Sequence, residues 1–498
     1  MASLPRPRTQ PVRLADIVAR LGLLGDGVDV PVTGITLDSR GILPGDVYAA
    51  LPGRSAHGAS FAAAAVAAGA VAVITDVDGS VACAGLGVPV LVVEDPRRLL
   101  GRVASRVYGD PAERLHSYGI TGTNGKTTVA SMVTSGLRAA GRVSGLIGTV
   151  GVRIGDTDYA GTRTTPESTD LHAILAAMVD EGVSSVVMEV SSIAIAEHRV
   201  DGLVFDIAAF TNLTQDHLDY HRTMADYFEA KASLFSADRT RLGIIGIDDE
   251  WGRALADRCP VPFETWSLSS PVADWTVQRS ATGWLVTEPG GLRTPIEMPL
   301  PGAFNVANAL CAFAVLRRAG VDPLVASEGI AAAAVPGRMQ VVGSVGGVTG
   351  IVDYAHSPDA IERVLLAARD LSIGRVIAVL GAGGGRDRGK RPLMGSVAAG
   401  LADVIVITDD NPRSEEPGEI RAAIMAGIDS TDGRRRAEVH DEGDRGRAIS
   451  VAVGMAEPGD LVVVLGKGHE QGQEVAGVVT PFDDASVLVS ALRRREQA

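Results

Sequence analysis

The sequence predicts an α/β protein of about three domains with parallel sheets, and three observations support this prediction. The chain has 498 residues, and a domain takes ~150 residues on average. Val/Ile runs recur, each followed by a glycine-rich turn and an Ala/Leu-rich stretch, as in SSVVMEV, RLGIIGI, RVIAVLGAGGG and DLVVVLGKG. This alternation is typical of parallel sheets with crossover helices. Hydrophobic residues make up 46% and aromatic residues only 4%, so aliphatic side chains must fill the cores.

Two changes in composition predict the domain boundaries. The polar segment GDPAERLHS, residues 109–117, precedes the first strong motif, and the glycine-rich segment VVGSVGGV spans residues 341–348. We therefore expect domains at 1–115, 116–345 and 346–498. The last third has its own alternation of strands and helices, so we expect it to fold independently and to dock against the middle domain.

Charge and cysteine content narrow the class of protein. The net charge of −14 argues against a nucleic-acid binder, which needs a basic face, but phosphate ligands need only local positive charge. Three separated cysteines without a CxxC pair indicate a reducing cytoplasm with no disulfide frame and no zinc site. The N-terminus lacks the apolar region of a signal peptide. The most apolar stretch, residues 61–74, is shorter than the ~18 residues of a membrane span and predicts a helix leading into a strand.

The strongest local signal is YGITGTNGKTTVASMV, residues 118–133. Gly122 and Gly125 permit tight turns, and the exposed N–H groups and the helix N-terminus attract phosphate. Lys126 can reach the β- and γ-phosphates, and the Thr127 hydroxyl can ligate Mg²⁺. Because Ile120 stands six places before Lys126, the strict phosphate-loop pattern becomes the variant GTNGKT. An ordinary glycine-rich strand–helix turn is the alternative.

Several polar side chains follow downstream. Glu189 ends the apolar run VVMEVSS, where an acid commonly helps to hold Mg²⁺. His217 can ligate a metal as a neutral imidazole or serve as a hydrogen-bonded structural histidine. Lys231, in YFEAKASLF, reads by itself as an exposed helix lysine. Thr164 and Thr165 precede a proline and either donate to an anionic ligand or form a turn before a helix.

The stretch TDDNPRSEEP, residues 408–417, follows the apolar run LADVIVI, which predicts a buried strand. It packs acidic residues, an amide and an arginine around two prolines. A solvated loop is one interpretation. A pocket for a small molecule that carries both charges is the other.

Ten motifs occur in one order: TGTNGKTT, TRTTPES, MEVSS, TNLTQDHLDYH, GAFNVANAL, PGRMQ, VDYAHSPDA, GRDRGKRPLMG, DNPRSEEP and GKGHE. Together they resemble the Mur ligases of peptidoglycan synthesis over nearly the whole chain, most closely the branch that adds the third residue of the stem peptide. The resemblance implies a smaller N-terminal α/β domain for a UDP-sugar. It also implies a central ATPase domain with a phosphate loop and a C-terminal Rossmann-like domain.

The resemblance also assigns roles around the nucleotide. Thr127, Glu189 and His217 look like ligands of one of two Mg²⁺ ions. Lys231 looks like the lysine that the family carbamylates with CO₂, an N6-carboxylysine able to bind the second ion. Lys126, Lys231, Glu189 and His217 would be the catalytic group. The implied ATP contacts are Gly122, Thr123, Asn124, Gly125, Lys126, Thr127, Thr128, Asn305, Asn308, Arg338 and Asp353.

A second set of residues would hold the sugar-peptide substrate. Segment ITLDSRGILPGDVYAALPGRSAHG resembles the family's uridine-binding segment. The implied contacts are Leu37, Ser39 and His57 near the uracil and diphosphate, and Thr164, Thr165, Ser191 and Arg199 on the muramoyl peptide. Two positions depart from the family pattern: Ile193 stands where histidine is frequent, and Glu197 where glutamine is frequent. Glu197 is less favourable beside an anionic substrate.

The implied reaction is ATP-driven amide formation on UDP-MurNAc-L-Ala-D-Glu through an acyl phosphate. Members that add diaminopimelate carry DNPR, and the Arg413 fork matches the distal carboxylate that lysine lacks. A site built around such a polar partner can reject the analogue without it by ~10⁴. The implied diaminopimelate contacts are Arg386, Asp410, Asn411, Arg413, Gly466 and Glu470. His356 is a candidate to take the proton of the attacking amine.

Three alternatives remain. A lysine-adding homologue is disfavoured by DNPR, and a folylpolyglutamate synthetase lacks the full uridine-binding domain that about 115 residues before the loop would form here. A non-catalytic nucleotide switch would leave Glu189 and Lys231 without a role. We expect a cytoplasmic monomer that acts on ATP, diaminopimelate and the UDP-sugar dipeptide, without nucleic acid and without membrane insertion.

Overall fold

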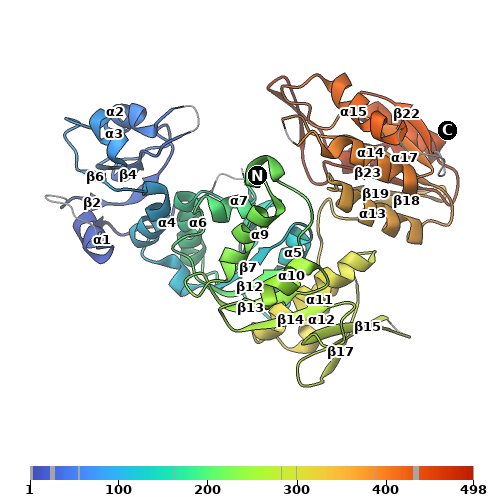
Figure 1. The fold of residues 1–498 in the computed structure, drawn as a ribbon, viewed down its shortest axis with the longest axis horizontal. Helices are drawn as coiled ribbons and strands as arrows, with labels where there is room; N and C mark the ends of the chain where they lie inside the picture. Colours follow the sequence, from blue (N-terminus) through green and yellow to red (C-terminus); the bar gives the residue numbers. More distant parts are fainter. Residues whose placement is uncertain are drawn as a thin grey trace.

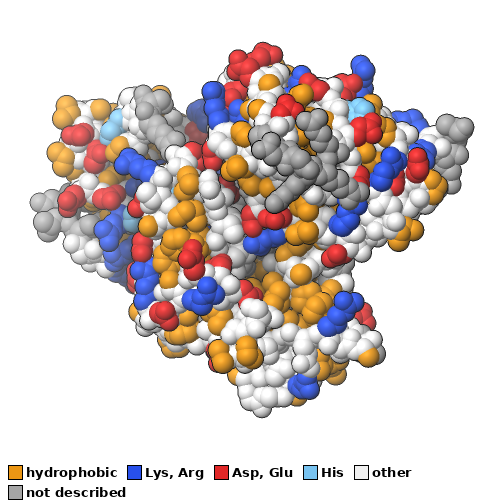
Figure 2. Space-filling model, turned by 45° about the vertical axis from the view of Figure 1, so that its right-hand side comes forward, with side chains coloured by type: hydrophobic (Ala, Val, Ile, Leu, Met, Phe, Trp, Pro, Cys, Tyr) orange, Lys and Arg blue, Asp and Glu red, His pale blue; other side chains and the backbone are white. Residues whose placement is uncertain are grey.

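The protein is described by a computed structural model that covers residues 4–22, 29–53, 56–161, 163–281, 283–298, 300–385, 387–429 and 437–496. Three α/β parts follow one another along the chain. The N-terminal part (blue) and the C-terminal part (orange and red) lie on either side of the central part (Figure 1). Acidic and basic side chains intermix over the face drawn in Figure 2 rather than gathering into areas of one sign.

The N-terminal part holds a parallel four-stranded sheet of order β3-β4-β5-β6 and a short antiparallel pair, β1-β2. Aliphatic side chains from both sides of this sheet are buried. Its elements are β1 (Val12–Arg13), α1 (Leu14–Arg20), β2 (Pro31–Val32), β3 (Gly34–Thr36), β4 (Asp46–Ala49), η1 (Gly58–Phe61), α2 (Ala62–Ala67), β5 (Ala72–Thr75), α3 (Val77–Ala82), β6 (Val90–Val92), α4 (Pro96–Val107) and η2 (Pro111–Arg114). The predicted helix and strand within residues 61–74 are α2 and β5, so that prediction is confirmed.

The central part is built on an eleven-stranded sheet of order β10-β9-β8-β11-β7-β12-β13-β14-β15-β16-β17. The strands from β8 to β15 in this order are parallel, and the outer strands are antiparallel. Apolar residues on its two faces form two separate cores. Because β7 lies in the middle, the phosphate loop that follows it is surrounded by other strand ends.

The elements of the central part, in chain order, are β7 (His116–Thr121), α5 (Lys126–Ala139), β8 (Ser144–Gly148), β9 (Gly151–Ile154), β10 (Thr157–Tyr159), α6 (Ser168–Asp180), β11 (Ser185–Glu189), α7 (Ser192–Ala196), β12 (Phe205–Phe210), α8 (Leu218–His221), α9 (Met224–Ala232), η3 (Ser233–Phe235), β13 (Thr240–Gly246), α10 (Glu250–Ala256), β14 (Phe263–Ser267), β15 (Trp275–Ser280), β16 (Gly283–Thr287), β17 (Arg293–Ile296), α11 (Ala303–Arg318) and α12 (Pro323–Ala331).

The C-terminal part has a six-stranded sheet of order β18-β19-β23-β20-β21-β22, parallel except for β18. Helices cover both faces, with one core under α13, α14 and α15 and another under α16 and α17. Its elements are β18 (Gln340–Val345), β19 (Val348–Asp353), α13 (Pro358–Leu371), β20 (Val376–Leu380), α14 (Lys390–Leu401), β21 (Val404–Ile407), α15 (Pro417–Asp429), β22 (Glu438–Asp441), α16 (Arg445–Met455), β23 (Leu461–Leu465), β24 (Gly472–Val475), β25 (Val478–Pro481) and α17 (Asp484–Glu496).

The four apolar runs that predict strands are β11, β13, β20 and β23, each paired in parallel with a neighbour. The predicted α/β class with parallel sheets is confirmed. We propose three domains, as the sequence predicts, but with the second boundary moved from residue 345 to a position before Gln340. Strand β18 pairs with β19, so a boundary at 345 would divide the C-terminal sheet.

Helix starts follow from short polar caps in the sequence. The side chains of Asp95, Asp322 and Ser357 accept hydrogen bonds from backbone N–H groups in the first turns of α4, α12 and α13. A proline follows each cap at the first helical position, where its missing N–H costs no hydrogen bond. Within the described residues, no helix combines the length and the apolar character needed to cross a membrane.

One buried ion pair ties α16 to α17. Arg445 Nε and Nη2 donate to the two carboxylate oxygens of Asp484, both at 2.7 Å, and both side chains are fully buried. Arg445 Nη2 also donates to the carbonyl of Leu465 at 2.9 Å, at the end of β23. This bidentate pair therefore anchors the last helix to the strand that leads into the candidate site.

We predict that Arg445→Met destabilises the protein by about 3–5 kcal/mol, because it leaves the Asp484 carboxylate buried without its partner. Chemical denaturation of both proteins measures this difference. Arg447→Met is the control, since the Arg447 side chain on the same helix is 76% exposed and exposed ion pairs contribute little. Equal destabilisation by both variants would contradict the prediction.

Candidate active site

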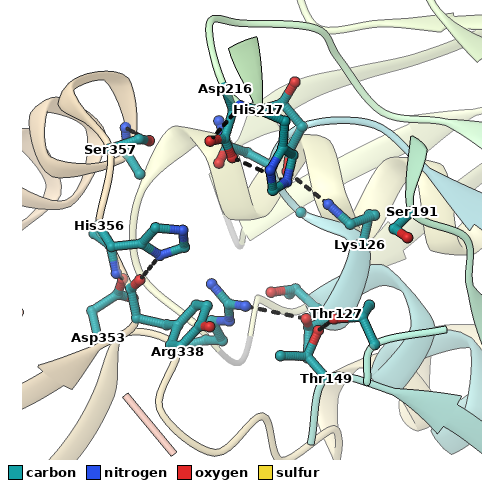
Figure 3. A pocket seen from close by; sticks show the side chains of 18 of the residues that line it. Lys126, Thr127, Thr149, Ser191, Asp216, His217, Arg338, Asp353, His356 and Ser357 are labelled. Carbon is teal, nitrogen blue, oxygen red and sulfur yellow. Dashed lines mark hydrogen bonds and ion pairs between the residues drawn. The ribbon is translucent and has the colours of Figure 1, made fainter. Parts of the chain in front are cut away.

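One pocket lies where the central and C-terminal parts meet. Figure 3 shows Lys126, Thr127 and Thr149 on one side and Arg338, Asp353 and His356 on the other. Its remaining lining residues from the sequence-predicted set are Thr123, Asn124, Gly125, Thr128, Thr164, Glu189, Ser191, His217, Lys231, Asn308, Asp410, Asn411, Arg413, Gly466 and Glu470. The phosphate loop and the DNPR motif, which lie far apart in the sequence, therefore share one cavity.

The phosphate loop joins β7 to α5. Gly125 has a φ of +88°, and a Cβ there would lie 2.2 Å from Asn308 Oδ1, so this position requires glycine. Lys126 Nζ donates to the carbonyls of Gly122 and Thr123 at 2.9 and 2.8 Å. Burial lowers the pKa of Lys126, and the Glu189 and Asp216 carboxylates oppose that shift. The phosphate loop thus holds the Lys126 amine at its centre.

Glu189, at the end of β11, is buried against two hydroxyl groups. Thr127 Oγ1 donates to Glu189 Oε2 at 2.9 Å. Thr149, after β8, donates its N–H to Oε1 at 2.8 Å and its hydroxyl to Oε2 at 3.0 Å. Three parallel strands therefore bring hard oxygen ligands together beside Lys126, a donor set that suits Mg²⁺.

His217 and its neighbour Asp216 face the same cavity (Figure 3). His217 has a φ of +54°, and its N–H donates to Asp216 Oδ1 at 2.9 Å. Burial by itself raises the pKa of Asp216, but His217, His356 and Lys390 outweigh it and bring the pKa to about 2. Burial lowers the pKa of His217, and Asp216 opposes that shift. The pair therefore places a carboxylate and an imidazole side by side at the cavity.

Lys231 is buried, with 1% of its surface exposed, so its interpretation as an exposed helix lysine is wrong. Its Nζ donates to the Gly122 carbonyl at 2.8 Å and lies 4.7 Å from the centre of the Tyr227 ring. Burial, and next the charge of Lys126, lower the pKa of Lys231 well below its ordinary value. Helix α9 thus delivers the Lys231 amine to the backbone of the phosphate loop.

The C-terminal part forms the wall of the pocket that faces the phosphate loop. Arg338 Nη2 donates to Thr127 Oγ1 at 3.2 Å, and its guanidinium lies 4.5 Å from the Tyr354 ring centre. Asp353 accepts from the N–H groups of Met339 and Ala355 at 2.6 and 2.7 Å. These contacts place an arginine and a carboxylate opposite the phosphate loop.

Two predicted asparagines lie one helical turn apart on α11. Asn308 lines the pocket, and its Nδ2 donates to Asn305 Oδ1 at 3.0 Å. Asn305 is buried and donates to the Pro301 carbonyl at 2.7 Å. Asn305 therefore orients Asn308, and among the described lining residues only Asn308 of the two faces the cavity.

The acidic stretch after β21 forms the far side of the same pocket. Asp410 and Asn411 are buried, so the solvated-loop interpretation is wrong for them. Asn411 Nδ2 donates to Glu470 Oε2 at 2.8 Å. Gly466 has a φ of +115°, and a Cβ there would meet Asp410 Oδ2 at 2.3 Å. Close packing of strand ends therefore requires a glycine in this motif.

Some predicted residues lie elsewhere. Leu37, Ser39 and His57 belong to the N-terminal part, and both His57 ring nitrogens are engaged, with Ala59 N–H and Asp76 Oδ1, each at 3.0 Å. Thr165 donates its hydroxyl to the Glu189 carbonyl at 2.9 Å. The remaining predicted residues outside the described lining are Gly122 and Arg199. Arg386 lies outside the described residues.

Sequence reasoning missed several residues that build the site. The available signal for Thr149 was its place as a polar residue directly after the apolar run of β8. The available signal for Asp216 was that this acid directly precedes His217. Lys467 is fully buried and donates to Asn411 Oδ1 and Glu470 Oε2, both at 3.1 Å. No local pattern distinguished this lysine from the rest of its glycine-rich motif.

A phosphate loop that shares one pocket with a second charged site is the arrangement of an enzyme that couples a nucleoside triphosphate to another substrate. Three family models match the chain: the Mur ligase family, catalytic domain over residues 31–108, the Mur ligase middle domain over 120–316, and the Mur ligase, glutamate ligase domain over 337–468. The chain therefore belongs to the Mur ligase family. The resemblance carried by the ten motifs is confirmed.

Individual relatives cover the whole chain. A UDP-N-acetylmuramoyl-L-alanyl-D-glutamate--2,6-diaminopimelate ligase of Streptomyces coelicolor is 49% identical and covers 99% of this chain and 99% of its own. A solved structure of a ligase with the same name is 32% identical, with a TM-score of 0.67 over 98% of this chain and 100% of its own. MurF ligase of Thermotoga maritima, solved with ADP, shares the fold at 16% identity, with a TM-score of 0.64 over 94% of this chain and 98% of its own.

We predict that Gly125→Ala weakens ATP binding by at least about tenfold, because left-handed strain of ~1–2 kcal/mol adds to the clash with Asn308. Titration calorimetry with a non-hydrolysable ATP analogue measures the affinity. Gly141→Ala is the matched control: Gly141 has a φ of +75° at the other end of α5, but a Cβ there meets nothing within 4 Å. Equal loss of affinity in both variants would mean that strain alone, and not the loop, is responsible.

Proposed function

We propose that the protein is an ATP-dependent ligase that joins diaminopimelate to the free carboxylate of UDP-MurNAc-L-Ala-D-Glu, in peptidoglycan precursor synthesis. One observation carries this proposal: the Lys126 loop and the Arg413 loop line a single pocket. The names of the Streptomyces coelicolor relative and of the 32% identical solved structure support the choice of substrates. The site belongs to a cytoplasmic monomer in this proposal.

The reaction needs neutralised charge more than it needs a covalent group from the protein. A carboxylate oxygen of the dipeptide attacks the γ-phosphorus, the bond to the bridging oxygen breaks, and ADP leaves. The amine of diaminopimelate then attacks the acyl carbon, and inorganic phosphate departs with the C–O electron pair. Lys126 lies on one side of the pocket, and Arg338 reaches Thr127 from the other side (Figure 3), so the two cations would offset the repulsion between the carboxylate and the triphosphate.

An acyl phosphate must be kept from water, so contact between the two halves of the pocket matters. Asn124 Nδ2 of the phosphate loop donates to Asp359 Oδ2 of α13 at 2.8 Å. His469 Nε2 lies 3.1 Å from the Thr149 carbonyl. These contacts across the domain boundary support a site that closes over its intermediate.

Magnesium fits the donor set of this pocket. Within the described residues, no three His, Cys, Asp or Glu side chains gather so that they could hold an ion by themselves. Mg²⁺ prefers few carboxylates together with water and substrate phosphates, so Thr127, Glu189 and His217 would hold one ion beside the nucleotide. When bound, the metal supplies positive charge at the phosphate oxygens.

Lys231 would hold a second ion after carbamylation. Burial and the charge of Lys126 lower the pKa of Lys231 well below the ordinary value, which favours the neutral, nucleophilic form of the amine. The Nζ lone pair attacks the carbon of CO₂, one C=O pair moves to oxygen, and the amine loses a proton to solvent. The resulting anion would face the Lys126 ammonium, which stabilises it.

The attacking amine must lose its proton. His356 lines the pocket, and its Nδ1 lies 2.7 Å from the Tyr354 carbonyl. Burial and the nearby Lys390 charge lower the pKa of His356 to about 4, so the imidazole is neutral at pH 7 and able to accept a hydrogen bond. We propose that His356 orients the attacking amine and that the proton then passes to solvent.

The N-terminal part would carry the UDP group through Leu37, Ser39 and His57. Thr164 and Ser191 line the pocket and would hold the peptide end of the same substrate. Arg199 sits between Glu167 at 3.1 Å and Glu197 at 3.7 Å. The Glu197 carboxylate is therefore paired with Arg199 within the protein. This pairing reduces its repulsion of an anionic substrate.

We predict that Lys231→Ala lowers ligation by at least ~100-fold, the scale on which one electrostatic stabiliser acts, and that a short carboxylic acid partly restores it. Carbon NMR with isotope-labelled bicarbonate should detect a carbamate in the native protein and none in the variant. Glu229→Ala is the control, since Glu229 is exposed on the same helix α9. An active native enzyme without the carbamate signal would refute the modification.

We predict that the native protein joins diaminopimelate and discriminates against lysine by ~10⁴, because lysine has no distal carboxylate for the donors of Arg413 that face the pocket. Ligation assays offer meso-diaminopimelate, LL-diaminopimelate and lysine side by side, each with ATP and the UDP-sugar dipeptide. Arg413→Ala should lose most of this discrimination while the KM for ATP stays the same. Arg388→Ala, an exposed arginine nearby, should behave like the native protein. Equal use of lysine by the native protein would contradict the proposed substrate.

A further inference from the structure

A two-stranded hairpin flanks the loop that carries Arg413. We call residues 408–417 the specificity loop and residues 472–481, which form β24 and β25, the flanking hairpin. All four residues of β25 are exposed, and Val478 and Val479 are 63% and 67% exposed. The flanking hairpin therefore owes little of its position to a hydrophobic core, and its polar contacts with the specificity loop must explain where it lies.

Backbone contacts hold Arg413 in an unusual conformation. Arg413 has a φ of +54°, a left-handed conformation that costs a non-glycine residue roughly 1–3 kcal/mol and persists only where surrounding contacts impose it. Arg413 N–H donates to the Glu474 carbonyl at 3.0 Å, and Ala476 N–H donates to the Arg413 carbonyl at 2.7 Å. The flanking hairpin supplies both contacts, so it sets the direction in which the Arg413 side chain leaves the backbone.

The same hairpin reaches the other two residues of the specificity loop that line the pocket. Gln473 Nε2 donates to the Asp410 carbonyl at 2.8 Å. Glu474 N–H donates to Asn411 Oδ1 at 2.9 Å. One strand, β24, therefore contacts Asp410, Asn411 and Arg413, the residues of the specificity loop that line the pocket.

The Arg413 guanidinium is held along two of its edges. Nη1 donates to the Gly384 carbonyl at 2.6 Å, and Nε lies 3.5 Å from Glu474 Oε2. Arg413 lines the pocket, whereas Glu474 is absent from the described lining. The carboxylate therefore acts on the guanidinium from outside the cavity and does not occupy the place of a substrate carboxylate.

We propose that Glu474 is a positioning residue for amino-acid selectivity, which fixes the Arg413 guanidinium so that its remaining donors face the distal carboxylate of the substrate. This proposal rests on the proposed function. A planar fork binds a carboxylate well only when its plane is already set. Gly384 and Glu474 together set that plane, because they hold two different nitrogens of the same group.

The opposite role for Glu474 predicts the opposite sign. If Glu474 competed with the substrate for Arg413, removal of its charge would strengthen diaminopimelate binding. Its place outside the pocket and its distance from Nε favour positioning. The sign of the change in KM for diaminopimelate therefore separates the two roles.

The test is steady-state kinetics of Glu474→Gln, which keeps the side-chain shape and removes the charge. The KM for diaminopimelate should rise about two- to fivefold, the size expected for a partly exposed ion pair. The preference for diaminopimelate over lysine should fall by the same factor. The kcat and the KM for ATP should remain unchanged, which also shows that the variant is folded.

Two further variants make the test specific. Glu416→Gln removes an exposed carboxylate of the specificity loop itself and should change none of these constants. In an Arg413→Ala background, Glu474→Gln should have no further effect on kcat/KM for diaminopimelate, because it acts through the missing guanidinium. A further effect in that background would overturn the proposal.

The outcomes also separate this proposal from the proposed function. A native protein that joins diaminopimelate, together with a Glu474→Gln variant whose KM for it is unchanged or lower, overturns the role of Glu474 alone. A native protein that joins no diaminopimelate overturns both. A selective rise in that KM, absent in the Glu416→Gln control, supports the assignment.

Discussion

The site depends on one constraint: two parallel sheets turn the carboxyl ends of their strands toward the same pocket. In the central part, β7, β8 and β11 end at the phosphate loop, Thr149 and Glu189. In the C-terminal part, β19, β21 and β23 end at Asp353, Asp410 and Gly466. Open α/β sheets bind ligands at these ends because loops and helix N-termini gather there. Because two such edges face each other across one cavity, the phosphate loop and the specificity loop lie together.

Polar contacts across that cavity do more than line it. Arg338 comes from the C-terminal side, yet it donates to Thr127 of the phosphate loop, and Thr127 in turn donates to Glu189. Asn124 of the central part donates to the C-terminal part, and His469 of the C-terminal part contacts the central part. Because these groups pair with one another across the boundary, the position of one half affects the electrostatics of the other. The proposed ligase reaction uses this coupling to exclude water from an acyl phosphate.

The amino-acid side is built in layers from the inside out. Asp410, Asn411 and Arg413 face the pocket, and buried Lys467 holds Asn411 and Glu470 from behind. The flanking hairpin holds the same loop from the solvent side. In the proposed reaction, selectivity would depend both on residues that contact the substrate and on residues, such as Glu474, that orient those contacts.

The sequence by itself determined the fold class, several of the buried strands and many of the residues that line the pocket. Apolar runs followed by glycine-rich turns specify buried parallel strands. Motifs such as GTNGKT and DNPR can be read from the sequence because the residues that share their chemistry are neighbours in the chain. What only the tertiary structure decided was burial and partnership. Lys231 is buried rather than exposed on the surface because α9 packs against the phosphate loop. Thr149, Lys467 and Glu474 gain their roles from strands far away in the chain, and no local pattern encodes a contact between segments that meet only after folding.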